Sequence, residues 1–194
     1  MSSEVVRSVR GFGTAATGAI AFSAATQVVT AALLWISVDE ATVLAAGFVA
    51  LLVQVVAGVL FIAWMRQARL NSDTITSRHQ HRWTNMWVIV GWIIPFANLF
   101  IPYAVMQDIW RGSDRTQPMV GLQKRPQSGL VTGWWITYIG SNALGVIAGR
   151  AALDDYALLS TVSTAGLVVA AVLAAQMIKQ VTERQEAVPV QVEA

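Results

Sequence analysis

Residues 91–102 read GWIIPFANLFIP, and this apolar stretch decides the fold because it contains two prolines and an asparagine. A proline inside a helix removes a hydrogen bond and clashes with the preceding turn, at a cost of about 3 kcal/mol. A continuous helix would bear that cost near Pro95 and again near Pro102. A break between them, with Asn98 capping a second helix and Pro102 in its first turn, removes most of it. The stretch therefore predicts two helical arms joined by a turn.

The composition indicates a membrane protein. The chain has 194 residues, of which 55% are hydrophobic and 12% charged, and its mean hydropathy is +0.55; a soluble domain carries about 25% charged residues. Four segments, residues 14–37, 42–65, 128–149 and 156–180, are long enough to cross a hydrocarbon core of about 30 Å. Short acidic loops join the first two and the last two into antiparallel hairpins. We expect one all-α domain over residues 1–181, followed by a polar, disordered tail over 182–194.

The distribution of positive charge discriminates between two paths for residues 83–110. If this segment crossed the membrane as a fifth span, the 13 Lys and Arg residues would be split seven to six between the two sides. If it enters and returns, all of them except Arg150 lie on one side, as the positive-inside rule favours. We therefore expect four transmembrane helices and a central re-entrant helical hairpin, with five spans as the alternative. Both termini would then lie in the cytoplasm.

The lengths of the two arms agree with a re-entrant path. The segments Trp83–Pro95 and Asn98–Trp110 are each twelve steps long, or about 18 Å of helix, which reaches just past the midplane of a bilayer. Polar residues of the spans are expected to pair. Gln27 and Gln54 lie near the middles of the first two spans, and folding that hairpin at its loop brings them together. The same construction sets Asn142 opposite Ser163 or Thr164.

The runs WMRQARLN at residues 64–71 and WVIVGWIIPFANLFIPYAVMQDIW at 87–110 resemble a bacterial integral-membrane family catalogued as domain of unknown function, family 4328. The matching positions are Trp64, Asn71, Gly91, Trp92, Pro95, Asn98, Pro102, Ile109 and Trp110. The family pattern has a basic residue three after the first Trp, where this chain has Gln67. The resemblance covers about residues 60–112. It implies a shared fold and supplies no activity.

The residues that could bind a ligand or partner lie mostly on the central hairpin. They are Asn71, Trp92, Pro95, Asn98, Pro102, Tyr103, Asp108 and Trp110. Asp108 stands three residues before Arg111, so we expect an interfacial ion pair. His79 and His81 are weak candidates for a metal site because no third ligand is evident. No catalytic residue can be assigned, since no ionisable group lies deep in the four spans and no phosphate loop or nucleophile–base arrangement is present.

Two hypotheses of function follow. In the favoured one, the protein is a non-catalytic module of the membrane whose re-entrant hairpin and basic cytoplasmic face engage a protein partner, another copy of the chain, or lipid headgroups. In the alternative, a cytoplasm-facing cavity binds or modifies a lipid-like or isoprenoid substrate. The sequence leaves open whether the chain is an enzyme. It implies no cofactor and no nucleic-acid partner.

Overall fold

The computed structural model describes residues 7–36, 38–117, 120–150 and 153–187. These residues form six α-helices, with no strand among them, so the expected all-α class is confirmed. The helices are α1 (Arg10–Leu33), α2 (Glu40–Thr76), α3 (Trp87–Ile93), α4 (Ile101–Gly112), α5 (Gly129–Ala148) and α6 (Leu153–Glu186). Three short 3₁₀ turns, η1 (Arg78–Gln80), η2 (Ala97–Leu99) and η3 (Leu122–Lys124), lie in the connections.

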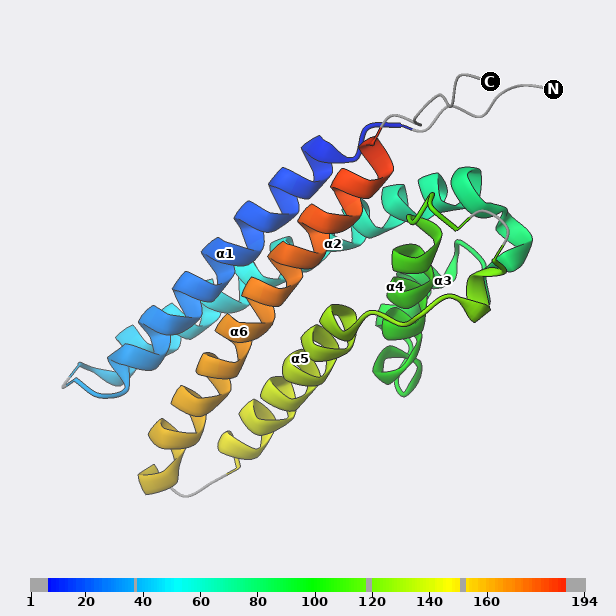
Figure 1. The fold of residues 1–194 in the computed structure, drawn as a ribbon. Helices are drawn as coiled ribbons and strands as arrows, with labels where there is room; N and C mark the ends of the chain where they lie inside the picture. Colours follow the sequence, from blue (N-terminus) through cyan, green and yellow to red (C-terminus); the bar gives the residue numbers. More distant parts are fainter. Residues whose placement is uncertain (1–6, 37, 118–119, 151–152, 188–194) are drawn as a thin grey trace, which may run out of the picture.

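The four long helices form an arc in the order α2, α1, α6, α5, in which each helix packs along the next. The end of the bundle where α1 begins and α6 ends is called the near end below. Arg10 and Glu186 form an ion pair of 2.8 Å there, which ties the two helices together. The small helices α3 and α4 pack against α2, and α4 also against α5 (Figure 1). The chain therefore crosses the length of the bundle four times in its described part.

Three helices are long and apolar enough to cross a membrane: α1, α2 and the part of α6 from Asp155 onward. The outward side of α2 carries large apolar side chains that are more than half exposed, among them Leu44, Phe48 and Leu51. A helix that is apolar on its outer face is typical of lipid contact rather than water. The fourth long helix, α5, has 20 residues and includes Ser141 and Asn142, and it is not among these three.

The long helices extend beyond the expected spans. The sequence predicts that the second span ends at Met65, but α2 continues to Thr76, and its last turns bury polar side chains such as Asn71 and Ser72. The polar tail was expected from residue 182, and this is wrong for its first residues. The helix α6 continues to Glu186, because Thr182 and Gln185 are buried against other helices. The rest of that tail, residues 188–194, lies outside the described part.

Residues 83–110 contain no continuous helix. The chain reverses between α3 and α4, so both helices have their outer ends towards the near end of the bundle. The two equal arms expected from the sequence are wrong: α3 has seven residues and α4 has twelve. Asn98 does not cap the second arm either, because it lies inside η2 and Phe100 precedes α4. Pro102 lies in the first turn of α4, as expected.

Glycines allow the hairpin to close and to dock. A Cβ atom added to Gly91 of α3 would lie 2.8 Å from Cγ2 of Ile101 and 3.8 Å from Cδ of Pro102. A Cβ on Gly112, at the end of α4, would overlap Oγ of Ser72 on α2. Since real Cβ atoms do not approach so closely, these positions let α3 contact α4 and let α4 contact α2.

Polar residues inside the bundle pair only partly as expected. Nε2 of Gln27 donates to Oε1 of Gln54 at 2.7 Å, which confirms that pair. The pairing of Asn142 across the helices is wrong, because its side chain donates to the carbonyl of Tyr138 in its own helix at 2.7 Å. Ser163 instead donates to the carbonyl of Ser141 at 2.8 Å. The carbonyl one turn back is always within reach of a short polar side chain in a helix, and it competes with distant partners.

Candidate functional site

The turn of the α3–α4 hairpin is apolar and exposed. We call residues 93–100 the hairpin tip. Ile93, Phe96 and Phe100 are 73%, 81% and 69% exposed, which are high values for side chains of this size. A cluster of large apolar side chains at the end of a projecting element is typical of a surface that contacts lipid or another protein.

The backbone of the tip is strained at its most exposed residue. Phe96 has a φ of 65° and a ψ of −44°, the rare, strained conformation at the centre of a γ-turn, which the Ala97 N–H closes by donating to the Pro95 carbonyl at 2.8 Å; such a conformation costs roughly 1–3 kcal/mol. Glycine would occupy this position without that cost. The strained turn places the Phe96 side chain at the most exposed point of the tip.

Of the predicted site residues, Pro95 and Asn98 lie in the tip. The Pro95 carbonyl accepts a hydrogen bond from Ala97 at 2.8 Å, and the Asn98 N–H donates to Ile94 at 3.0 Å. These bonds satisfy part of the turn's backbone internally. The Asn98 side chain makes no hydrogen bond to the described residues. Pro102 is buried where α4 begins.

Trp92 lies in a second region, an aromatic cluster between the helices. Its ring meets Phe61 of α2 edge-on at 6.0 Å, and Trp135 and Tyr138 of α5 at 5.8 and 6.3 Å. Trp92 thus bridges α2 and α5, which stand at opposite ends of the arc. The cluster forms one wall of a half-open cavity of about 160 Å³ between the helices of the bundle. Gln27 and Gln54 also line this cavity.

Asp108 lies in a third region, a buried cluster of charged side chains at the base of the hairpin. Its carboxylate is almost fully buried and accepts hydrogen bonds from Nη2 and the backbone N–H of Arg82, at 3.0 and 3.1 Å, and from Gln123 at 3.2 Å. Nη1 of Arg111 lies 3.8 Å away, which confirms the expected ion pair. Arg82 is the closer partner, and the sequence did not identify it.

A second buried ion pair adjoins this one. Arg69, almost fully buried on α2, binds Asp73 one turn later and donates to the Trp83 carbonyl at 2.9 Å. Asp73 also accepts from Nδ2 of Asn85 at 2.9 Å. The pair therefore fixes the chain that leads from α2 into α3. Because both carboxylates of the cluster are paired with arginines, neither is placed as a free acid or base.

The two histidines have different surroundings. His79 is exposed, whereas the side chain of His81 is fully buried. Its Nε2 lies 3.2 Å from Oγ of Ser72 and 3.5 Å from Oδ1 of Asp73. Burial, with the positive charge of Arg69, lowers the pKa of His81 to about 4 in spite of Asp73. Among the described residues no three His, Cys, Asp or Glu side chains meet as a metal site requires.

Asn71 connects the near ends of three segments. Its side chain accepts from the N–H of Arg7 at 3.1 Å and donates to the Arg7 carbonyl at 2.7 Å. It also donates to Oε1 of Gln185 at 3.2 Å, and Gln185 in turn donates to Ser113 at 2.8 Å. Every described contact of Asn71 is internal. Asn71 therefore ties these segments together, and a binding role for it stays a prediction.

Tyr103 and Trp110 hold α4 against its neighbours. The Tyr103 hydroxyl lies 3.1 Å from Oγ1 of Thr132 at the start of α5. The guanidinium of Arg184 lies 4.1 Å above the ring of Trp110, a cation–π contact between α4 and α6. Gln107, which the sequence did not single out, exchanges two hydrogen bonds of 2.9 and 3.0 Å with the backbone of Ser128. It thereby fixes where α5 begins.

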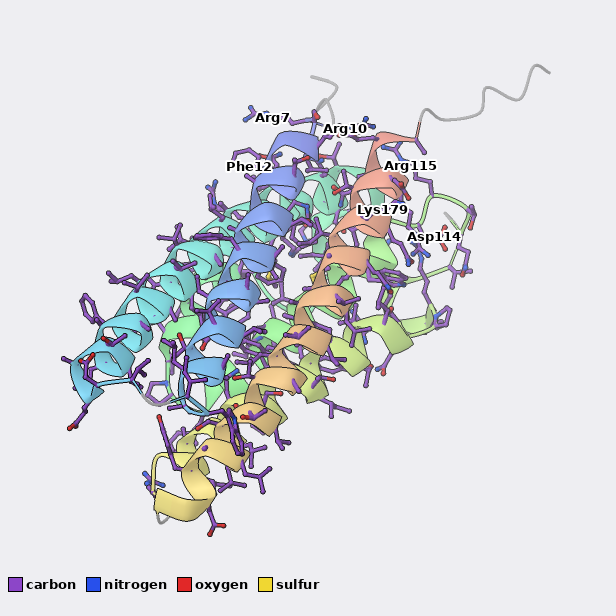
Figure 2. All side chains as sticks on the ribbon, turned by 90° about the vertical axis from the view of Figure 1, so that its left-hand side faces the viewer. Arg7, Arg10, Phe12, Asp114, Arg115 and Lys179 are labelled. Atoms are coloured by element: carbon purple, nitrogen blue, oxygen red, sulfur yellow. The ribbon has the colours of Figure 1, made fainter. Side chains whose placement is uncertain are left out.

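Basic side chains of the near end divide into exposed and buried groups. Figure 2 shows Arg7, Arg10, Arg115 and Lys179 towards this end of the bundle. Arg115 is half-buried and donates to the Gln185 carbonyl at 3.1 Å; Arg7, Arg10, Arg66, Arg78, Lys124 and Lys179 are exposed, whereas Arg69, Arg111 and Arg125 are buried. Arg125 alone donates to four backbone carbonyls within residues 111–120, at 2.7 to 3.0 Å. The buried arginines hold the fold, so only the exposed group is free to meet an external anion.

The predicted site residues therefore do not form one site. They occupy the exposed tip, the aromatic wall of the cavity, and the buried base of the hairpin. Two local spacings indicate the charge cluster, Asp108 with Arg111, which was expected from the sequence, and Arg69 with Asp73, which was not; each pair lies one turn apart on a helix. No local signal in the sequence could have identified Arg82, because its contact with Asp108 joins residues that are 26 apart.

Comparison with known proteins finds one family. A family model described as "Domain of unknown function (DUF4328)" matches residues 26–183. The match includes every motif position from Trp64 to Trp110 and extends well beyond them on both sides. No curated protein and no solved structure matches the chain significantly.

Proposed function

Since the chain belongs to the DUF4328 family, a membership that names no activity, we propose a function from geometry: the protein is a non-catalytic membrane module that anchors its hairpin tip in one leaflet and binds anionic lipid headgroups. In this proposal α1, α2, α5 and α6 cross the bacterial plasma membrane. Both chain ends and the base of the hairpin face the cytoplasm.

The observation that carries the proposal is the apolar tip held on a rigid polar base. Ile93, Phe96 and Phe100 are exposed at the tip, and two buried ion pairs, Arg69–Asp73 and Arg111–Asp108, lie at the other end of the same hairpin. Water would not favour so much exposed apolar area, whereas the hydrocarbon of a bilayer would. Along the α3–α4 hairpin the side chains change from charged at the base to apolar at the tip. A leaflet changes in the same way, from charged headgroups at its surface to hydrocarbon inside.

The short first arm supports a path through one leaflet. The seven residues of α3 span about 10 Å at 1.5 Å per residue, less than the roughly 15 Å of one hydrocarbon leaflet. The carbonyl of Leu99 in the tip accepts a hydrogen bond of 3.1 Å from Trp135, so α5 protects part of this backbone from lipid. The same length argues against a fifth crossing.

The exposed cations support binding of anionic headgroups. Arg66, Arg78 and Lys124 are exposed, and Arg82 is 42% exposed beside Asp108. A basic residue near an anionic surface contributes about 1 kcal/mol of attraction. The basic residue Arg150 lies at the opposite end of the bundle, where α5 ends.

Because the chain contains no cysteine, a single cysteine introduced at a chosen position is the only site that a thiol-reactive label can modify. Phe96→Cys at the tip and His79→Cys in the exposed connection would each carry one fluorescent label, in vesicles of phosphatidylethanolamine and phosphatidylglycerol. We expect the label at position 96 to be quenched by brominated acyl chains and not by iodide, and the label at 79 to be quenched by iodide. Equal iodide quenching at both positions would overturn the proposal. Shielding of position 96 from both quenchers would show that a protein covers the tip.

The headgroup claim has its own measurement. The variant Arg66→Gln/Arg78→Gln/Lys124→Gln alters only exposed cations, and we expect it to retain less phosphatidylglycerol after purification in mild detergent, with phosphatidylethanolamine unchanged. Glu183→Gln, an exposed change of the opposite sign, serves as the control. Unchanged phosphatidylglycerol in the triple variant would remove the headgroup claim.

A further inference from the structure

We infer that the cavity between α1, α2, α5 and α6 binds a membrane-soluble molecule that carries a six-membered ring with a carbonyl or hydroxyl oxygen. This goes beyond the proposed function, which concerns the hairpin tip and the lipid headgroups. The inference rests on the size of the cavity, on its two unlike walls, and on two amides that are only half paired.

The size suits one ring. The cavity measures about 160 Å³, and an engineered apolar cavity of about 150 Å³ in another protein holds one benzene molecule. A phospholipid headgroup is larger and strongly polar, and nothing charged lines the cavity. Its occupant must therefore be compact where it enters and largely uncharged.

The walls suit a flat molecule. Phe61, Trp92, Trp134 and Tyr138 contribute rings on one side, and α6 contributes the small side chains Ala170 and Ala174 on another. Aromatic rings favour offset or edge-on contact with a further ring. Alanines leave the space that a larger residue would fill, so a planar group fits between the aromatic side chains and α6.

The glutamines supply the polar contact. Gln27 donates to Gln54 at 2.7 Å, and this uses one donor and one acceptor of the pair. The carbonyl of Gln27 and the amide N–H groups of Gln54 have no partner among the described residues. Unpaired amide groups are costly where no water is near. An oxygen on the bound ring would accept a hydrogen bond from the Gln54 amide. A purely apolar ring would leave that amide unpaired and its energetic cost in place.

Trp92 connects the cavity with the hairpin. It stands between Phe61 of α2 and Tyr138 of α5, beside the direct contact of Phe61 with Trp134 of α5 at 5.4 Å. Its Nε1 is buried and has no hydrogen-bond partner among the described residues. The pocket is half open to its surroundings, so a membrane-soluble ligand can enter it from the bilayer.

The experiment compares two probes with a six-membered ring and the same alkyl chain, decyl-substituted benzoquinone, which has two ring carbonyls, and decylbenzene, which has none; each is added to the purified full-length chain in lipid nanodiscs. Binding is measured as a ligand-dependent rise in the unfolding temperature, and for the quinone also as quenching of tryptophan fluorescence. We expect the quinone to bind about tenfold more tightly, which corresponds to about 1.4 kcal/mol.

Two variants assign the binding to the cavity. Gln27→Leu/Gln54→Leu removes both amides without leaving one unpaired, and we expect the preference for the quinone to disappear while decylbenzene binds as before. Ala170→Phe fills the space and should abolish binding of both probes; Ala25→Phe on the exposed face of α1 is its control. Failure of both probes to bind the wild-type chain, or equal affinities that the double variant leaves unchanged, would overturn the inference. Neither result depends on the depth of the label at position 96.

Discussion

Replacing Asp108 by asparagine should strongly destabilise the fold, because it leaves buried cations without their counter-charge. Asp108 is 1% exposed, and its partner Arg111 is 6% exposed. Removing one member of a buried ion pair costs about 3–5 kcal/mol. Asparagine keeps the shape and one acceptor, and Arg82 is 42% exposed and can turn to solvent, so we expect about 3 kcal/mol. For a chain of this length that corresponds to a fall of about 6–12 °C in the unfolding temperature.

The assay is thermal unfolding of the purified protein in mild detergent, followed by circular dichroism. Glu183→Gln makes the same acid-to-amide change in an exposed ion pair of 4.0 Å, and its effect should be below about 1 kcal/mol. Arg111→Met, introduced into the Asp108→Asn protein, should restore part of the loss because it removes the stranded charge. If Arg111→Met lowered stability equally in both backgrounds, or if Asp108→Asn behaved like Glu183→Gln, the electrostatic reasoning would be refuted.

Two further predictions concern packing and pH. Gly91→Ala should destabilise the protein by about 1–3 kcal/mol, because the added Cβ would press on α4. Gly140→Ala, whose Cβ would meet nothing within 4 Å, should be neutral or slightly stabilising. Chemical unfolding of both variants in the same detergent measures the difference. His81 has a pKa of about 4 in the folded chain and near 6.5 in the unfolded chain. The free energy of unfolding therefore has the full contribution of the neutral imidazole above a pH of about 6.5. It loses this contribution as the pH falls towards 4, by up to about 1.4 kcal/mol per pH unit. Unfolding measured across this range should become less dependent on pH in His81→Gln but not in His79→Gln, and an identical slope in all three proteins would contradict the buried, neutral imidazole.

Much of the helical arrangement could be read from the chain. Apolar runs of about 20 residues predicted the positions of the long helices, since length and hydropathy are local properties. The spacing of Pro95 and Pro102 predicted a break in the middle segment, because proline acts on its own turn. Gln27 and Gln54 could be paired because a short loop fixes the register of two antiparallel helices.

Other features could not be read in this way. The arms of the hairpin are unequal, and Asn98 lies within η2 instead of capping α4. Such details depend on how the turn packs against Trp135 and its neighbours, and not on the propensity of one residue. Asn142 bonds within its own helix for a similar reason: the rotation of a helix about its axis is set by the whole contact surface.

By itself, the sequence determined that the chain is helical, that it is apolar enough for a membrane, and that its middle segment breaks at the prolines, because each of these follows from neighbours along the chain. Only the tertiary structure decided that Arg82 reaches Asp108, that Trp92 contacts both α2 and α5, and that half-paired amides face a cavity. Those contacts join residues that are far apart in the sequence, and no local preference specifies which distant surfaces will meet when the helices pack.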